Sequence, residues 1–339
     1  MKRILPLFLA LALLLTGCAA VSTTESTSQT VSQVDSSSQA SALESASESA
    51  SSQLESVSIT DSNGSQITLD TSAPRVVAAY GSFAEAWLLA GGELCGVTQD
   101  ALEQRDLGLP EDIAVVGTVK EPNAEEIIAL EPDLVLLASD ITAQADIRDV
   151  LENAGLACAF FQVDTFADYA FMMEQLCAVT GREDLYEENV TQVGQQIEEA
   201  QANAALSSTR PNVLLIRAFS TGIKAKTDDE LAGAILKDLG AHNIADDHPS
   251  MLEDLSLEEV IAADPDYIFV TTMGDEQKAL DYLNGLIQQN PAWSELSAVK
   301  EDRYIVLPKD LFHYKPNNRW GESYQYLGEI LYPELFHEE

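Results

Sequence analysis

Short apolar runs alternate with amphipathic segments along most of this chain. The first series of expected strands and helices covers residues 57–60, 66–69, 75–79, 83–90, 96–98, 114–116, 124–130, 134–137, 143–154 and 157–161. The second series follows Pro211 and covers 213–216, 230–239, 256–262, 267–270, 276–290, 304–306 and 320–332. Strands that alternate with helices through short loops are typical of a mostly parallel α/β sheet. The pattern therefore predicts an N-terminal lobe over 57–183 and a C-terminal lobe over 207–339.

A single amphipathic segment lies between the two series. Residues 184–206 contain no proline, and their apolar positions recur at steps of three to five residues, the spacing of one helix face. At a rise of 1.5 Å per residue, a helix over this segment is about 34 Å long. We predict that one long, rigid helix joins the two lobes.

The two series share an internal repeat. Residues 124–137 read AEEIIALEPDLVLL and residues 257–270 read LEEVIAADPDYIFV, with six identical positions at a constant offset of 133 residues. Each copy follows a helix N-cap residue, Asn123 or Ser256, and carries a glutamate three residues after it that completes a capping box. A Pro-Asp pair ends each helix before an apolar strand. The two lobes are therefore expected to contain the same helix–strand unit.

The N-terminus has the features of an export signal and a lipid anchor. Two basic residues precede an apolar run at 4–15 that is too short to span a bilayer as a helix. The run ends in Leu-Thr-Gly-Cys, which predicts a lipoprotein signal peptide over 1–18 and a lipid on Cys18. Residues 19–56 are rich in Ser, Thr, Gln, Glu and Ala and are expected to form a disordered tether. The predicted location is the extracytoplasmic face of the cell membrane.

Composition excludes several classes of function. The chain has 18 Lys and Arg against 56 Asp and Glu, and this net charge of −38 repels nucleic acid. No P-loop, Gly-x-Gly-x-x-Gly, Cys-x-x-Cys or His-Glu-x-x-His motif occurs. The Gly-x-Ser-x-Gly motif of α/β hydrolases is also absent, which leaves an exported hydrolase as a distant alternative. We expect a binding protein rather than an enzyme, with no intrinsic cofactor and no nucleic-acid partner.

Several motifs occur together in the order found in one protein family. They are the lipobox, the Ser-rich tether, Arg-Val-Val-x-x-Tyr-Gly-Ser at 75–82, Gly-x-x-x-x-Pro-Asn-x-Glu at 117–125, Pro-Asp-Leu-Val at 132–135, the interlobe helix and the second copy of the repeat. In these respects the chain resembles the substrate-binding lipoproteins of ABC importers for iron-siderophores, haem and cobalamin. The resemblance covers about 74–333. It implies a class III periplasmic-binding fold, in which two similar α/β lobes with mostly parallel sheets are joined by a single long rigid helix.

The resemblance also implies partners. Such proteins bind a metal chelate between their lobes and deliver it, as monomers, to the permease dimer of an ABC transporter with its ATPase. An outward-facing glutamate near the start of the repeated helix in each lobe meets arginines of the permease, and the matching residues here are Glu125 and Glu258. Their neighbours Glu126 and Glu259 are expected to act in the caps, which leaves the two docking residues free. The alternative is that both docking residues only complement the helix dipole.

The candidate ligand site follows from the sheet topology without reference to any family, because ligands of open α/β sheets bind at the carboxyl ends of the strands. The residues expected to bind ligand in these loops are Tyr80, Ser82, Gln99 and Lys120 in the first lobe, and Arg217, Phe219, Lys224, Lys226, Met273, Phe312, His313, Tyr314 and Arg319 in the second. Lys309 and Lys315 belong to the same second-lobe loops. A basic cluster in so acidic a protein indicates an anionic group on the ligand. The alternative is that these are solubilising surface lysines.

The cargo expected from these loops is a ferric siderophore, with haem and then cobalamin as alternatives. Aromatic faces suit a flat porphyrin, corrin or catecholate, and arginine suits a carboxylate. A ferric chelate already satisfies its metal, so we expect no metal ligand from the protein. If the cargo is haem, His313, Tyr80 or Met273 could each serve as an axial ligand.

Other conspicuous side chains are expected to serve the fold. Trp87 lies among apolar neighbours on an expected helix, and Trp293 is expected to pack locally in an Asn-Pro-Ala-Trp turn. Cys95, Cys158 and Cys177 remain after lipidation, and no two of them have redox spacing. They are either small buried residues or include one disulfide.

Overall fold

The computed structural model describes residues 56–253 and 255–336. The expected signal peptide at 1–18, its Cys18 and the expected tether up to residue 55 lie outside the described residues. No described helix is both long enough and apolar enough to cross a membrane. The described residues belong to one structural unit, Gln53–Glu339.

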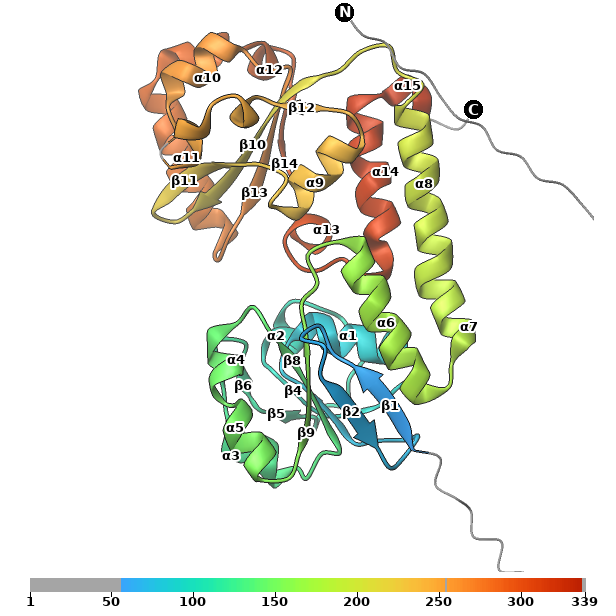
Figure 1. Ribbon diagram of the computed structural model, residues 1–339. Helices are drawn as coiled ribbons and strands as arrows, with labels where there is room; N and C mark the ends of the chain where they lie inside the picture. Colours follow the sequence, from blue (N-terminus) through green and yellow to red (C-terminus); the bar gives the residue numbers. More distant parts are fainter. Residues whose placement is uncertain (1–55, 254, 337–339) are drawn as a thin grey trace, which may run out of the picture. The chain divides into compact units, whose positions relative to one another are not determined.

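The N-terminal lobe contains a five-stranded parallel sheet with the order β5-β4-β3-β8-β9 (Figure 1). Its strands are β3 (Val76–Ala78), β4 (Leu94–Val97), β5 (Ala114–Val115), β8 (Leu134–Ala138) and β9 (Ala157–Phe161). The helices between them are α1 (Gly81–Leu89), α2 (Asp100–Glu103), α3 (Ala124–Ala129), α4 (Thr142–Asp146) and α5 (Arg148–Asn153). Two hairpins complete the lobe, β1 (Val57–Thr60) with β2 (Gln66–Leu69) and β6 (Gly117–Thr118) with β7 (Glu121–Pro122).

The C-terminal lobe contains a second five-stranded sheet, with the order β11-β10-β13-β14 and β12 paired to β10. Its strands are β10 (Asn212–Phe219), β11 (Gly222–Lys226), β12 (His242–Asn243), β13 (Tyr267–Thr272) and β14 (Tyr304–Val306). Its α-helices are α9 (Leu231–Asp238), α10 (Leu257–Ala263), α11 (Glu276–Gln289), α12 (Ser297–Lys300), α13 (Lys309–Phe312), α14 (Trp320–Leu331) and α15 (Pro333–Phe336). Short 3-10 turns are η2 (Ile244–Asp246), η3 (Pro249–Leu252), η4 (Pro291–Glu295) and η5 (Asn317–Arg319).

One strand of this sheet differs from the expectation. Lys224–Lys226 are expected in a loop, but these residues belong to β11, which runs antiparallel to β10 and pairs Lys224 with Arg217. The strand alternates buried Ala225 with polar neighbours, a pattern too short to identify a strand from the sequence. The remaining pairs of the sheet are parallel.

A continuous run of helical residues joins the two lobes. α7 (Glu183–Tyr186), the π-turn η1 (Glu187–Thr191) and α8 (Gln192–Ala204) follow one another without a gap, close to the helix expected over 184–206. α14 packs along α8 (Figure 1). The two helices come so close at Gly321 that an added Cβ atom would lie 2.1 Å from Oε1 and 2.8 Å from Cβ of Gln196.

The structure contains one long helix that the apolar pattern does not predict. α6 (Phe166–Thr180) precedes the interlobe helix, and Thr165 and Asp168 form a capping box at its start. Its end is marked by Gly181, which has a φ of 67°. The largest apolar cluster runs from the sheet of the N-terminal lobe through α6, α8 and α14 to the sheet of the C-terminal lobe, so the helices that connect the lobes share one core with both.

The repeated helix–strand unit has the same local structure in both lobes. The side chains of Asn123 and Ser256 accept hydrogen bonds from backbone N–H groups of the first turn, as expected for N-caps. The reciprocal bond of a capping box is found in neither copy among the described residues; instead, Glu259 accepts from the Ser250 hydroxyl at 3.0 Å. Each helix is followed by a residue with positive φ, Glu131 at 46° and Asp264 at 41°.

The aspartate of each Pro-Asp pair fastens the neighbouring strand. Asp133 accepts a hydrogen bond from the N–H of Arg75 at 2.7 Å, at the start of β3. Asp266 accepts from the N–H of Asn212 at 2.8 Å, at the start of β10. The repeat therefore extends to a tertiary hydrogen bond, because the aspartate of each copy accepts from the backbone at the start of the equivalent strand in its own lobe.

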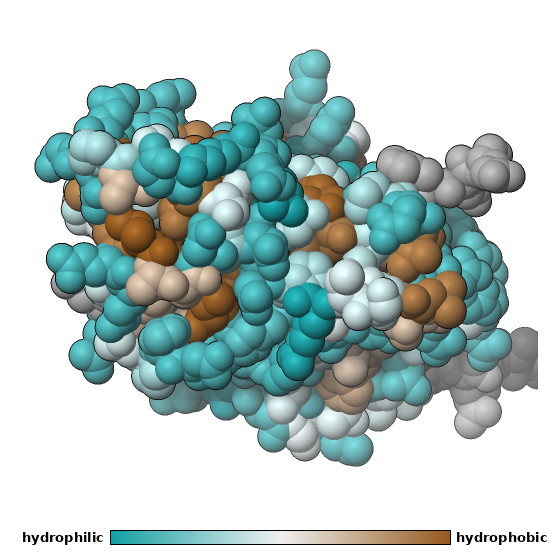
Figure 2. Space-filling view, turned by 90° about the horizontal axis from the view of Figure 1, so that it is seen from above, coloured by the Kyte–Doolittle hydropathy of each residue, from teal (hydrophilic) through white to brown (hydrophobic). Residues whose placement is uncertain are grey.

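The expected core residues are buried, and the surface is mainly polar. Trp87 and Trp293 are each 1% exposed, and Trp293 packs edge-to-face against Tyr304. Cys95, Cys158 and Cys177 are all free thiols. On the face shown in Figure 2, hydrophilic residues predominate and apolar residues form separate patches.

Candidate ligand-binding cleft

A cavity of about 770 Å³ lies between the lobes at the carboxyl ends of their strands. Loops after the strands of both sheets contribute to it, as expected for open α/β sheets. The first lobe supplies Tyr80, Asp100, Gln104, Val119, Lys120, Asp140, Ile141, Thr142 and Asp164. The second lobe supplies Arg217, Asp229, Glu230, Leu231, Met273, Gly274, Lys309, Phe312, His313, Tyr314 and Lys315. We refer to this cavity as the cleft.

The structure brings seven of the residues expected to bind ligand into the cleft. They are Tyr80, Lys120, Arg217, Met273, Phe312, His313 and Tyr314. Phe312 is 1% exposed and packs against Tyr326, so it supports the wall from behind. Met273, by contrast, is 40% exposed. Contact between these residues and a ligand stays a prediction.

Six of the expected residues lie outside the cleft lining. Ser82 is buried and accepts a hydrogen bond from Arg105 at 2.8 Å, and the Gln99 side chain donates to Glu103 at 2.5 Å. Phe219, Lys224 and Lys226 belong to β10 and β11 and do not line the cavity. Arg319 borders a separate cavity of about 310 Å³ and is paired with Asp310 and Glu322 at 2.7 and 2.8 Å.

Carboxylates accompany the cations of the cleft. Arg217 forms an ion pair with Glu230, and Lys315 lies 3.1 Å from Asp164. Burial would raise the pKa of Asp164, but the hydrogen bond from Gln162 and the charge of Lys315 outweigh it and lower the pKa. The basic cluster is therefore largely neutralised within the protein.

Two lysines of the cleft lack a described acidic partner. The Nζ atom of Lys309 donates to the carbonyl oxygen of Gly274 at 2.6 Å, and Lys120 is exposed and has no ion pair with any described residue. These two cations belong to different lobes, and both line the cleft. They are the charges most available to an anionic ligand.

His313 is held neutral at physiological pH. Burial, together with the charges of Arg217, Lys309 and Lys315, lowers the pKa of His313 to about 4. Burial also raises the pKa of Tyr80, against the opposing charge of Lys315. The cleft thus offers a neutral imidazole and a neutral phenol beside its charged groups.

None of the acidic residues that line the cleft is among the residues expected to bind ligand, although Asp100 and Asp140 lie in loops at the carboxyl ends of the strands. Asp100 is 7% exposed, and its Oδ2 atom accepts from the N–H of Gly81 at 2.7 Å, which fixes the start of α1 next to Tyr80. Asp229 and Glu230 follow Lys226 closely in sequence, and Lys226 pairs with both. The only sequence signal for these pairs is the stretch Lys-Ala-Lys-Thr-Asp-Asp-Glu at 224–230, in which two basic residues precede three acidic ones, and such charged stretches are common on any polar surface.

Glu125 and Glu258 lie on the first turns of α3 and α10 and are both exposed. Neither carboxylate has a hydrogen bond or ion pair with another described residue. Both helices lie on the side of their lobe away from α8 (Figure 1). Neither residue lines the cleft.

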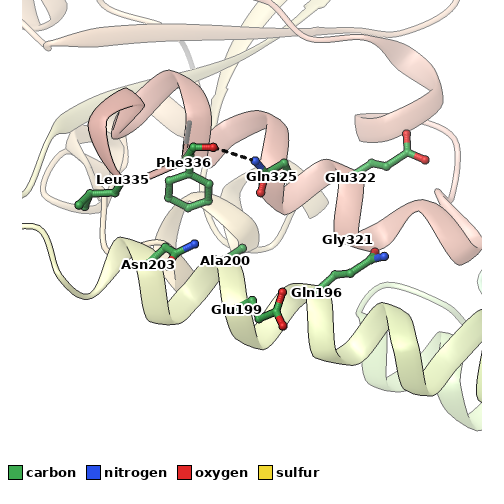
Figure 3. Close-up of a pocket in the computed structure, with 9 residues that line it drawn as sticks. All are labelled: Gln196, Glu199, Ala200, Asn203, Gly321, Glu322, Gln325, Leu335 and Phe336. Carbon is green, nitrogen blue, oxygen red and sulfur yellow. Dashed lines mark hydrogen bonds between the residues drawn. The ribbon is translucent and has the colours of Figure 1, made fainter. Parts of the chain in front are cut away.

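A further cavity, of about 400 Å³, lies between α8 on one side and α14 and α15 on the other (Figure 3). Its lining consists of Gln196, Glu199, Ala200, Asn203, Gly321, Glu322, Gln325, Leu335 and Phe336. Gln325 donates to the carbonyl oxygen of Phe336 at 3.4 Å. The lining contains two carboxylates and no cation, so it lacks the chemistry expected for an anionic chelate. Among the described residues, no group of three or more potential ligands is arranged to hold a metal ion.

Two α/β lobes with mostly parallel sheets, joined by a helix and lining a shared cleft, define a two-lobed solute-binding protein. The chain belongs to the periplasmic binding protein family, whose family model matches residues 76–311. The class III fold expected from the sequence is confirmed by this match and by the solved structures that resemble the chain.

Individual relatives have low sequence identity to this chain, but the matches cover most of both proteins. The Fe(3+)-citrate-binding protein YfmC of Bacillus subtilis is 26% identical over 266 residues, which covers 76% of this chain and 79% of that protein. Staphylococcus aureus IsdE complexed with heme has a TM-score of 0.63 at 18% identity and covers 76% of this chain and 99% of its own. S. aureus SirA complexed with staphyloferrin B has a TM-score of 0.62 at 19% identity and covers 83% and 99%. These structural likenesses concern the fold.

Proposed function

We propose that this protein captures an iron chelate, first of all a ferric siderophore, in the cleft and delivers it to an ABC importer. The observation that carries the proposal is the cleft itself, a cavity of about 770 Å³ to which both lobes contribute aromatic and cationic side chains. Its volume falls in the range of small-molecule sites, about 300–1,000 Å³. Relatives that bind ferric citrate and staphyloferrin B support an iron-chelate cargo. Binding and release require no covalent chemistry from the protein.

The charges of the cleft suit a chelate that carries carboxylate or catecholate oxygens. Lys309 and Lys120 have no acidic partner among the described residues, so an anionic ligand can pair with them without breaking an existing ion pair. Tyr80 and Tyr314 offer aromatic faces on opposite lobes. Counting Lys309 and Lys120 as well, the lining has four cations against five carboxylates, so the cleft as a whole is close to neutral, which favours a ligand of low net charge over a polyanion.

Haem is the second candidate, and a specific arrangement favours it. His313 and Met273 both line the cleft, and an imidazole and a thioether are both able to coordinate haem iron. The lowered pKa of His313 leaves its ring free to coordinate a metal at neutral pH. The relative IsdE is solved with heme bound. Cobalamin stays a further alternative within the same class.

The exposed glutamates Glu125 and Glu258 support docking to the permease. Each begins the repeated helix of its lobe, so the two positions offer one carboxylate per lobe to a permease dimer. The neighbouring cap bonds use backbone N–H groups and leave both carboxylates unpaired with described residues. The lipobox supports attachment of the exported protein to the membrane through Cys18. We expect a monomer tethered at the extracytoplasmic face.

Ligand titration tests the proposed cargo. The purified full-length chain is titrated with ferric citrate, a ferric hydroxamate, a ferric catecholate and haemin, and binding is followed by tryptophan fluorescence and by the Soret band. Lys309→Ala should weaken binding of an anionic chelate by about tenfold, the size expected for one lost charge contact in a partly buried site. Lys300→Ala is the matched control, since Lys300 pairs with Glu295 outside the cleft. Absence of binding to all four ligands would refute the iron-chelate proposal.

A further inference from the structure

A polar cluster beneath the cleft connects the two lobes directly. The segment between α13 and α14 reaches α1 of the N-terminal lobe, and Arg105, two residues after the end of α2, contacts it there. The Nη2 atom of Arg105 donates to the carbonyl oxygen of Lys315 at 2.9 Å and to Ser82 Oγ at 2.8 Å. Arg105 also forms an ion pair with Glu85, and its side chain is only 10% exposed.

Asn317 is the centre of this contact. It is completely buried, and its Nδ2 atom donates to the carbonyl oxygen of Ser82 at 2.9 Å and to Oε2 of Glu85 at 2.6 Å. Its φ is 53°, a conformation that asparagine tolerates better than most residues and that glycine adopts freely. Two hydrogen bonds to the other lobe therefore hold a turn that few other side chains could occupy.

The next residue ties the same turn to the interlobe helix. Asn318 Nδ2 donates to Oδ1 of Asn189 at 3.1 Å, and Asn189 lies in the π-turn η1. Asn189 in turn donates to the carbonyl oxygens of Leu89 at 3.2 Å and Leu185 at 3.0 Å. A π-turn leaves some backbone carbonyl groups without their usual helical partner. Here the carbonyl oxygen of Asn189 accepts a hydrogen bond from the Tyr169 hydroxyl at 3.2 Å.

We propose that Glu85, Arg105, Asn189, Asn317 and Asn318, here called the junction, act as positioning residues that hold the 313–315 segment against the N-terminal lobe and so set the geometry of the cleft. His313, Tyr314 and Lys315 immediately precede the junction residues in sequence and line the cleft. None of the junction residues lines the cleft. The consequence of the junction, a preformed wall for the ligand, rests on the proposed function. The hydrogen bonds of the junction themselves do not depend on which cargo is bound.

The physical reason is the cost of opening a buried polar network. Lobe separation at this point would break the charge-assisted hydrogen bonds of Glu85 and Arg105, which are 22% and 10% exposed and border the cavity of about 310 Å³, and would leave the fully buried Asn317 without partners. The Lys315–Asp164 ion pair also joins this segment to the N-terminal lobe, but the Asp164 side chain is 51% exposed. The junction adds the more buried contacts of the segment with that lobe.

Two measurements on the full chain without ligand test the junction. Asn317→Gly keeps the positive φ and removes both hydrogen bonds, and Arg105→Lys keeps a charge for Glu85 but removes the fork that reaches Lys315. Hydrogen–deuterium exchange is measured by mass spectrometry over 82–89, 187–191 and 313–319. The titration of His313 is followed by nuclear magnetic resonance. The matched control is Asp302→Gly, an exposed residue with a φ of 55° outside the junction.

We expect at least tenfold faster exchange in 82–89 and 313–319 for both variants, and a His313 pKa that rises from about 4 toward its ordinary value as the segment leaves its buried, cationic surroundings. The control should change neither quantity. Unchanged exchange and an unchanged His313 titration in both variants would overturn the proposal. If these changes occur but no iron chelate binds the parent protein, the junction stands and only the proposed function fails.

Discussion

His313 and the cations around it determine how the cleft responds to pH. With a pKa of about 4 in the folded protein, its imidazole is neutral at pH 7. A histidine in the unfolded chain titrates near its ordinary value of about 6.5. Between these two values the unfolded chain binds the additional proton, so the stability of the fold decreases as the pH falls.

His313→Gln should remove much of this pH dependence. At about 1.4 kcal/mol per pKa unit, His313 should lower the free energy of unfolding by on the order of 2 kcal/mol between pH 7 and pH 5. Urea denaturation of parent and variant at both pH values measures the difference. His248→Gln is the control, since His248 does not line the cleft. The same pH dependence in the His313 variant and the parent would contradict the role given to His313.

At the scale of single elements, the Pro-Asp repeat explains how each lobe begins its sheet. Asp133→Ala and Asp266→Ala should each lower the free energy of unfolding by about 1 kcal/mol, because each removes a charge-assisted hydrogen bond from the first residues of a central strand, partly screened by solvent. Thermal and urea denaturation measure the loss. Asp112→Ala, at an exposed site outside both sheets, should be neutral. A loss in one lobe only would show that the repeat is not equivalent in the two lobes.

The close contact between α8 and α14 leads to a second prediction at this scale, which concerns the stability of the fold. Gly321→Ala should destabilise the fold by about 1–3 kcal/mol, because the new methyl group would overlap the Gln196 side chain. Gly285→Ala is the matched control on α11, where nothing lies within 4 Å of an added Cβ atom. The control should gain up to about 1 kcal/mol, since alanine is the better helix former. A neutral Gly321 variant would mean that the helices can move apart at no cost.

Most elements follow from local patterns, and the exceptions have physical causes. The long helix α6 is missed because buried and partly buried residues surround it on several sides, so no polar face marks its period. Its capping box at Thr165 and its terminal Gly181 are the signals that could have identified it. β11 is missed because its antiparallel partner, β10, supplies the evidence for it only in three dimensions.

At the scale of the whole molecule, the two repeated helices offer one exposed glutamate per lobe. Charge reversal at both positions, Glu125→Arg with Glu258→Arg, should abolish uptake by the importer and leave the affinity for cargo unchanged, because neither residue lines the cleft. Uptake in cells and titration of the purified protein measure the two quantities. Glu126→Arg, next to the first site and also exposed, is the control for the added charge. A changed cargo affinity, or normal uptake, would contradict docking through this pair.

The sequence by itself determined most of the strands and helices, the interlobe helix and the repeat, because periodicity, caps and breakers act between residues a few positions apart. Only the tertiary structure decided which loop residues share the cleft. Arg319 and Lys226 carry the expected charge, but both lie outside the cleft lining, and acidic residues three to nine positions away in the sequence neutralise them: Asp310, Glu322, Asp229 and Glu230. The junction is likewise tertiary, because Asn317 and Glu85 lie 232 residues apart and meet only when both lobes have folded.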